Sequence, residues 1–172
     1  MAALEFTRRY AMAHRFLSDV SPKCMTPHGH NETVVVRLAP ASPFQFGAGN
    51  MDAPFEAAKG RWKAWIDDHV DHAFMLNAAD PLIGWFRAHE PARLPRLMTF
   101  DGDPTTEALA AVFWLKLDAF LTADDLPFSV AEVRVEETPT NAVVLTRDGF
   151  DPHSCGLRAS WPHRPDFSIN DF

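Results

Sequence analysis

Two stretches near the start of the chain alternate between apolar and polar residues with a period of two. In residues 4–14 the apolar side chains and His14 share one parity, and most charged side chains occupy the other. This alternation indicates a β-strand with one buried face. The second stretch begins at His28 and continues into three consecutive valines at 34–36, which strands favour. We expect the two strands to pair as a hairpin across the loop at 15–27.

Two further stretches repeat apolar residues at helical intervals. The first follows a loop at 39–51 that is rich in proline and glycine. Asp52 can cap this helix, and Pro54 suits its first turn. Apolar residues then recur every three or four positions, and we expect the helix to end near Val70.

A second helix is predicted later in the chain. Asp103 can cap it, and Pro104 suits its first turn. A broad apolar stripe follows at 109–121, and the helix should stop before Pro127. The stripe is more simply explained by core packing than by a cofactor site.

The last regular elements are predicted to form a second hairpin. Residues 128–137 alternate like the first strand, and residues 142–146 return after a turn. The segment at 81–96 contains three prolines, and we expect it to be irregular. The order of elements lacks β-α-β alternation. It favours an α+β fold with a four-stranded antiparallel sheet built from two hairpins and two helices packed on one face.

The length of 172 residues suits one well-cored domain and is short for two. We place that domain at residues 1–148 and expect residues 149–172, which are rich in proline, to form an irregular C-terminal extension that lies across a neighbouring surface or stays mobile. Hydrophobic residues make up 47% and charged residues 23%, which is typical of a globular protein. The net charge of −7 disfavours non-specific binding to nucleic acid or to an anionic membrane.

The cysteine content and the apolar runs bear on the compartment. Two cysteines do not indicate a disulfide framework, and a reduced compartment fits them better. No apolar run approaches the length of a membrane span, and the first residues lack the apolar core of a signal peptide. We therefore expect a cytoplasmic protein that binds neither nucleic acid nor membranes.

The candidate chemistry lies where the first strand ends and the second begins. Alternate side chains of a strand leave the same face, so His28 and His30 should point at one locus. His14 ends the apolar face of the first strand, and pairing would bring all three imidazoles together. Three neutral nitrogens with a fourth position open are typical of catalytic Zn²⁺. The H-x-H pattern alone more often marks ordinary core or surface histidines, and the third histidine strengthens the case for a metal.

The residues around these histidines resemble a known family. AHRF, followed by KC and then by HGHN after three residues, resembles the 6-carboxytetrahydropterin synthase and 6-pyruvoyltetrahydropterin synthase family of T-fold (tunnelling-fold) enzymes. The resemblance implies that His14, His28 and His30 bind zinc and that Cys24 is the catalytic thiol. A lone cysteine is usually an inert small hydrophobe. Lys23 and a nearby metal would favour the thiolate here.

Asp71 and His72 form a second candidate cluster. By themselves they are more simply explained as polar residues at a helix end, where Asp71 can orient His72 directly only if the helix stops there. The family's helix ends in an Asp-His pair followed by Leu-Asn, and DHAFMLN at 71–77 resembles it. The resemblance implies that Asp71 and His72 are the proton-transfer pair.

Glu137 is the third candidate. It shares a strand face with valines, where a carboxylate is costly unless something satisfies it. A buried salt bridge or a wet strand end could do so, and so could the ring N–H and exocyclic amine of a pterin. The family anchors its pterin with a Glu-Thr pair, which Glu137 and Thr138 match. DPTTEALA resembles the family's helix start, which assigns Thr105 and Thr106 to the same pocket.

The resemblance implies a zinc-dependent lyase that converts 7,8-dihydroneopterin triphosphate to 6-carboxy-5,6,7,8-tetrahydropterin, an early step toward queuosine and other deazapurines. Three features depart from the family: Glu32 where an aromatic residue is usual, a longer segment at 81–100, and the tail after Gly149. A 6-pyruvoyltetrahydropterin synthase-type or other pterin side-chain reaction stays open, as does a metal- or pterin-binding relative without turnover. The resemblance also implies a homo-oligomer, a hexamer of two trimer rings, with the pocket between subunits.

Overall fold

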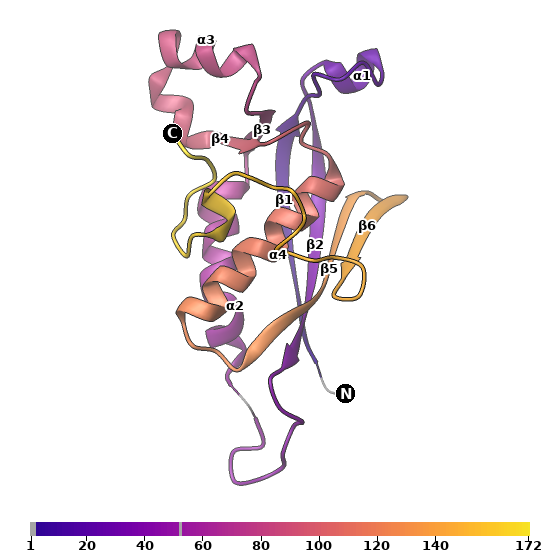
Figure 1. Ribbon diagram of the computed structural model, residues 1–172, viewed down its shortest axis with the longest axis vertical. Coiled ribbons are helices and arrows are strands. Elements are labelled where there is room, and N and C mark those ends of the chain that lie inside the picture. The colour runs from indigo at the N-terminus through magenta and orange to yellow at the C-terminus, as the bar shows by residue number, and fades with distance from the viewer. Residues whose placement is uncertain (1–2, 52) are drawn as a thin grey trace.

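A computed structural model describes residues 3–51 and 53–172. Within them the chain forms one six-stranded sheet in the order β4-β3-β1-β2-β5-β6 (Figure 1). In chain order the strands are β1 (Leu4–His14), β2 (His28–Pro40), β3 (Ala73–Asn77), β4 (Leu97–Phe100), β5 (Phe128–Thr138) and β6 (Asn141–Thr146).

The sheet contains the predicted hairpins and two strands that were not predicted. β1–β2 and β5–β6 are antiparallel hairpins, and β5 pairs antiparallel with β2. β3 and β4 extend the sheet beyond β1 as parallel strands, so the four predicted antiparallel strands are present but the predicted number of strands was too small by two. Both added strands are short and largely buried, so they lack the alternation that reveals a half-exposed strand.

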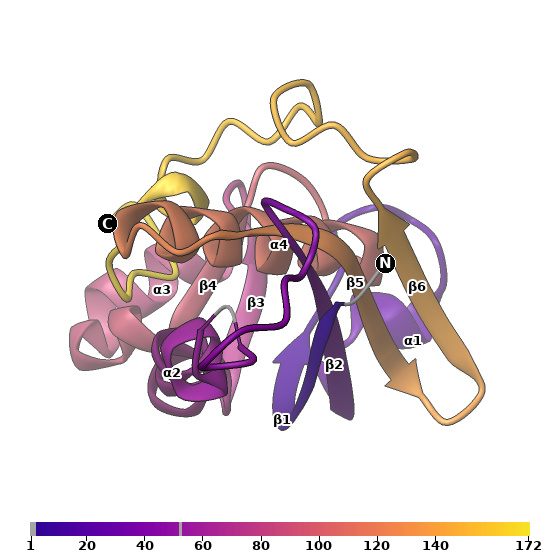
Figure 2. The same cartoon turned by 90° about the horizontal axis from the view of Figure 1, so that it is seen from below.

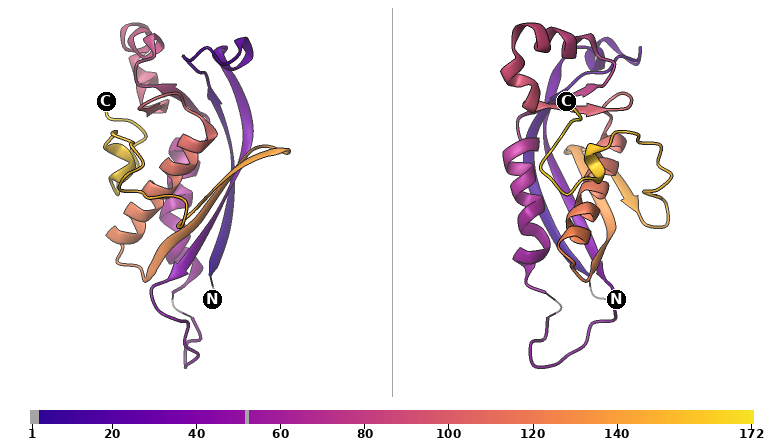
Figure 3. Two further views of the ribbon diagram at one scale, coloured as in Figure 1. Left: turned by 45° about the vertical axis from the view of Figure 1, so that its right-hand side comes forward. Right: turned by 60° about the vertical axis from the view of Figure 1, so that its left-hand side comes forward.

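Two long helices cover one face of the sheet, as predicted (Figures 2 and 3). We call it the helix-covered face, and the face of opposite parity the open face. The helices are α1 (Pro22–Met25), α2 (Phe55–Trp65), α3 (Pro81–His89) and α4 (Thr106–Ala123), with a π-helical turn at Ile66–Val70 and 3₁₀ turns at Pro91–Arg96 and Trp161–His163. In the described part of the chain no helix is both long and apolar enough to cross a bilayer.

The start of α4 differs from the prediction. Thr105 caps the helix, because its side chain accepts a hydrogen bond from the backbone N–H of Ala108. Asp103 instead accepts the backbone N–H groups of Leu17 and Ser18, each at 2.9 Å. The carboxylate that was expected to start α4 therefore fixes the chain just beyond β1.

The other helices bring further corrections. α2 starts at Phe55 without a side-chain cap, and the predicted cap, Asp52, lies outside the described residues. The helical stretch ends at Val70, as predicted, and its last turn is a π-helix. The segment predicted to be irregular contains α3, which Asp80 caps through Leu82 N. Its first proline occupies the first helical turn, where proline is well tolerated.

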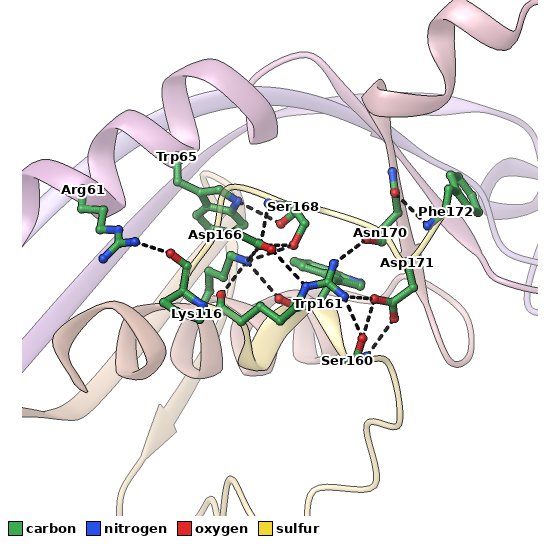
Figure 4. A network of polar contacts seen from close by, with 12 residues as sticks. Arg61, Trp65, Lys116, Ser160, Trp161, Asp166, Ser168, Asn170, Asp171 and Phe172 are labelled. Atoms are coloured by element: carbon green, nitrogen blue, oxygen red, sulfur yellow. Dashed lines mark hydrogen bonds and ion pairs between the residues drawn. The ribbon is translucent and has the colours of Figure 1, made fainter. Parts of the chain in front are cut away.

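The segment after β6 packs against α4 around a buried cation (Figure 4). Lys116 has a fully buried side chain, and its Nζ donates to the carbonyls of Trp161 and Arg164, both at 2.9 Å. Asp166 Oδ1 and Ser168 Oγ lie 3.3 and 3.4 Å from the same nitrogen. Trp161 is also fully buried, so this segment contributes directly to the core.

Candidate metal centre and active site

β1 and β2 bring three histidines together at one end of the sheet. The strand register pairs His14 with His28 and Met12 with His30, which places the three imidazoles in adjacent positions on the helix-covered face. One ligand nitrogen from each ring lies within 4.8 Å of the others. The convergence expected from the period-two pattern is therefore present in the fold.

Gly29 permits this close approach of the two strands. A Cβ atom built at Gly29 would lie 2.7 Å from the carbonyl oxygen of Met12. That contact is with backbone, which cannot swing aside as a flexible side chain could. Any larger residue would push β1 and β2 apart, and the imidazoles with them.

The hydrogen bonds of two histidines fix their tautomers. His14 Nδ1 lies 3.0 Å from the Pro104 carbonyl, and His28 Nδ1 lies 2.8 Å from the Thr26 carbonyl. A carbonyl oxygen only accepts, so each Nδ1 carries the proton and each Nε2 keeps a lone pair. The two Nε2 atoms are 3.0 Å apart. Two facing lone pairs at that distance repel unless a cation or a shared proton lies between them.

The donor set fits a divalent metal such as Zn²⁺. Three neutral imidazoles are a common ligand set for catalytic zinc. Burial lowers the pKa of His14, and the nearby His28 and His30 lower it further against the opposing effect of the Pro104 carbonyl. The imidazole is thereby kept in the neutral form that a metal requires.

Cys24 lies on α1, next to the end of β1. Its Sγ accepts a hydrogen bond from Ser21 Oγ at 3.1 Å, and its carbonyl accepts the Phe16 N–H at 2.9 Å. The second bond ties α1 to the residues just beyond His14. Among the described residues no hydrogen bond joins Cys24 to the three histidines.

Asp71 and His72 form the direct pair that the sequence suggested. The helix ends before them, His72 adopts a left-handed backbone with φ of 63°, and its Nδ1 lies 2.9 Å from Asp71 Oδ2. Asp71 Oδ1 also accepts the Ala11 N–H at 2.7 Å, which fixes the carboxylate beside β1. The His72 side chain is 78% exposed. Within residues 3–51 and 53–172, no hydrogen bond or ion pair links it to the histidine triad.

Glu137 lies beside the triad at the end of β5. Its Oε1 is 4.0 Å from His30 Nε2 and accepts a hydrogen bond from Thr106 Oγ1 at 2.9 Å. The hydroxyl of Thr105 caps α4, and that of Thr138 accepts a backbone N–H in the β5–β6 turn. Glu137 and Thr106 are therefore brought together, whereas the other two threonine hydroxyls are used in local structure.

Sequence reasoning gave no role to a buried pair in the same place, Tyr10 and Glu32. Glu32 is 2% exposed and accepts a hydrogen bond from Tyr10 Oη at 2.7 Å. Burial raises the pKa of Glu32 to about 7, with the opposing effect of the Tyr10 hydrogen bond and a further rise caused by the charge of Glu137. Glu32, like Glu137, falls on the apolar face of its strand in the alternating sequence pattern. The same argument could therefore have identified Glu32 as a candidate residue.

Comparison with known proteins identifies a family for this chain. A family model described as 6-pyruvoyl tetrahydropterin synthase matches residues 3–148. A protein of Halobacterium salinarum described as a probable 6-carboxy-5,6,7,8-tetrahydropterin synthase is 32% identical over 134 residues, which cover 76% of this chain and 77% of that protein. The 6-carboxy-5,6,7,8-tetrahydropterin synthase of Rickettsia bellii is 27% identical over 139 residues, which cover 79% and 95%.

The fold is also that of a solved pterin synthase. The structure of Caenorhabditis elegans 6-pyruvoyl tetrahydropterin synthase aligns with a TM-score of 0.55 at 22% identity, and the alignment covers 84% of this chain and 94% of that one. At this identity the likeness concerns the fold alone. It agrees with the T-fold expected from the sequence.

Proposed function

Because this chain belongs to the 6-pyruvoyl tetrahydropterin synthase family, we propose that it is a zinc-dependent 6-carboxy-5,6,7,8-tetrahydropterin synthase that acts on 7,8-dihydroneopterin triphosphate. The observation that carries the proposal is the pair of facing Nε2 lone pairs on His14 and His28, with His30 beside them. Two curated relatives named for this activity support the choice of product.

The three histidines would hold the metal. When bound, Zn²⁺ supplies a positive charge that stabilises negative charge developing on the oxygens of the substrate side chain. The carbonyls of Pro104 and Thr26 would keep two of the imidazoles oriented for that task.

Other residues of the chain would orient the substrate and move protons. Glu137, fixed by Thr106, would accept the ring N–H and the exocyclic amine of the pterin. Cys24 as thiolate would remove a proton from the side chain, and His72, oriented by Asp71, would exchange protons with the intermediate. Triphosphate would then leave by elimination, and one water molecule would add to the side chain as its C–C bond breaks, which yields the 6-carboxyl group and releases acetaldehyde.

We also propose that the pocket is completed by another copy of the chain, in a hexamer of two trimer rings. The exposed His72, which has no link to the triad among the described residues, supports this arrangement. Mixed oligomers of Cys24→Ala and His72→Ala chains should recover part of the activity that each variant lacks alone. If the sites were complete within single chains, mixing would restore nothing.

Mass analysis of products tests the reaction. After incubation with 7,8-dihydroneopterin triphosphate, the zinc-loaded protein should form 6-carboxy-5,6,7,8-tetrahydropterin, and Cys24→Ala should form almost none. Circular dichroism and zinc content of the variant control for folding and metal loading. Equal product from both preparations would show that the role given to Cys24 is wrong.

A second candidate is 6-pyruvoyltetrahydropterin synthesis, which the description of the matching family model favours. The same assay separates the two, because the products differ in mass. Tight pterin binding without any product would instead indicate a non-catalytic relative.

A further inference from the structure

Glu32 marks the boundary between the candidate site and the hydrophobic core. On the helix-covered face of β2 it follows His28 and His30, and Val34, the next residue on that face, is fully buried. Glu32 itself is 2% exposed. A carboxyl group in such a position is costly unless both of its oxygens find hydrogen bonds.

The described chain supplies a hydrogen bond to only one of these oxygens. Glu32 Oε2 accepts from Tyr10 Oη, whose ring is held against Phe113 with 5.4 Å between the ring centroids. Oε1 has no hydrogen-bond partner among the described residues. The one fully enclosed side-chain polar atom without a partner there is Trp62 Nε1, so Glu32 Oε1 is not fully enclosed.

A second carboxyl group lies next to it across the sheet. The β2–β5 register ends at the pair Thr33 and Glu136, and Glu32 and Glu137 each lie one residue beyond it. The two carboxyl groups are close enough for the charge of Glu137 to raise the pKa of Glu32. Two neighbouring carboxyl groups suit a ligand with several N–H donors along one edge.

We propose that Glu32 is a specificity-determining residue, whose Oε1 accepts the second hydrogen of the exocyclic amine of a 2-aminopteridine ring bound by Glu137. The inference rests on the proposed function. The donor edge of such a ring carries one ring N–H and two amine hydrogens, and a single carboxylate can take two of the three in a bidentate pair. Glu32 provides the acceptor that the third hydrogen requires.

Glu32→Gln tests the assignment because it preserves the shape of the side chain. The amide oxygen can still accept from Tyr10, while the NH₂ group replaces Oε1 and presents donors to the amine. A ring with a carbonyl in place of the amine, such as lumazine, would accept from that NH₂ group. The substitution should therefore weaken pterin binding and shift the preference of the site from pterin toward lumazine.

The measurement is the ratio of the dissociation constants for pterin and lumazine, obtained by ligand fluorescence with the zinc-loaded protein. Wild type should prefer pterin. In Glu32→Gln the dissociation constant for pterin should rise about ten- to hundredfold, and that for lumazine should fall. Glu132→Gln is the matched control, because Glu132 lies on the open face of β5 with its carboxylate 3.8 Å from Arg37, and it should leave the ratio unchanged.

A double variant covers the case in which Glu32→Gln folds poorly. Tyr10→Phe combined with Glu32→Leu removes the acceptor and leaves no orphaned polar group, so it should weaken pterin binding without improving lumazine binding. If wild type prefers pterin and a folded Glu32 variant shows the same ratio of dissociation constants for pterin and lumazine, the role of Glu32 is wrong. The proposed function would not be affected by that result. A wild type that binds neither ring would overturn both this inference and the proposed function.

Discussion

Two regions of α4 contact polar clusters of opposite character. At its start, Pro104 and Thr106 face a site where two imidazole nitrogens present unshared lone pairs to each other. In its second half, Lys116 is enclosed by oxygens of the segment after β6, so that its ammonium group finds every partner within the chain. Buried groups that a chain satisfies by itself hold its fold together. Groups that it leaves unsatisfied are available to a ligand.

The largest effect is expected at the first cluster. In His30→Ala, bound zinc measured by mass spectrometry should fall from about one ion per chain to background, because three ligands are needed to hold the ion. Unfolding of the metal-free variant should match that of metal-free wild type within about 1 kcal/mol, since His30 is only half-buried. If His30→Ala retained all of its zinc, the histidine triad would not be the metal site.

The second cluster should respond in the opposite way. Lys116→Ala leaves the carbonyls of Trp161 and Arg164 without their donor and opens a cavity in the core, and should lower the free energy of unfolding by about 3–5 kcal/mol. Lys116→Met, which fills the space with an apolar chain, should be closer to wild type. Denaturant titration measures both.

Two controls sharpen that result. Arg8→Ala breaks an exposed ion pair with Asp67 and should cost about 1 kcal/mol or less. Zinc content should be unchanged in both Lys116 variants. Loss of zinc from either would show that the two clusters depend on one another.

A pH dependence of stability is expected to be smaller than the effect of Lys116→Ala. Burial lowers the pKa of Lys116 to about 8, against the opposing attraction of Asp166, whereas the unfolded side chain titrates near 10.4. Between these values the unfolded chain holds a proton that the folded chain has released, so the free energy of unfolding should rise with pH, by about 1–3 kcal/mol. Below pH 8 both states are protonated and this contribution is flat.

Denaturant titrations between pH 7 and 10 measure that rise, and Lys116→Met should lack it. The series stops at pH 10 because burial raises the pKa of Tyr10 well above its usual value, with the charge of Glu32 adding to the rise. Above that pH the unfolded chain ionises this tyrosine first, and stability should fall. If the free energy of unfolding of Lys116→Met rose with pH by the same amount, the rise would come from another titratable group.

The sequence predicted the parts of the fold that repeat a local pattern. Alternation identified both hairpins and placed His14, His28 and His30 on one face, because a register of paired strands leaves little freedom. β3 and β4 were missed because a short strand buried on both faces has no alternation. The prediction that Asp103 caps α4 was wrong because its carboxylate oxygens accept hydrogen bonds from the backbone of another segment. Local sequence does not show such a contact.

The buried cation illustrates a similar limit. Lys116 lies within an apolar stripe, and its acceptors follow 45 to 52 residues later, so nothing near it in sequence indicates its environment. Glu32 was different, because its parity with His28 and His30 was visible. The exposure of His72 depends on how the chain turns after α2, which the sequence pattern did not specify.

The contact at Gly29 gives a way to sort related sequences without any experiment. A homologue with alanine or a larger residue between the two histidines would have to separate its first two strands to relieve a 2.7 Å approach to a carbonyl oxygen. Such a homologue would keep the scaffold but could not load an ion in the same way. Reading that one position across genomes should therefore separate metal-loading members from those that have retained only the architecture.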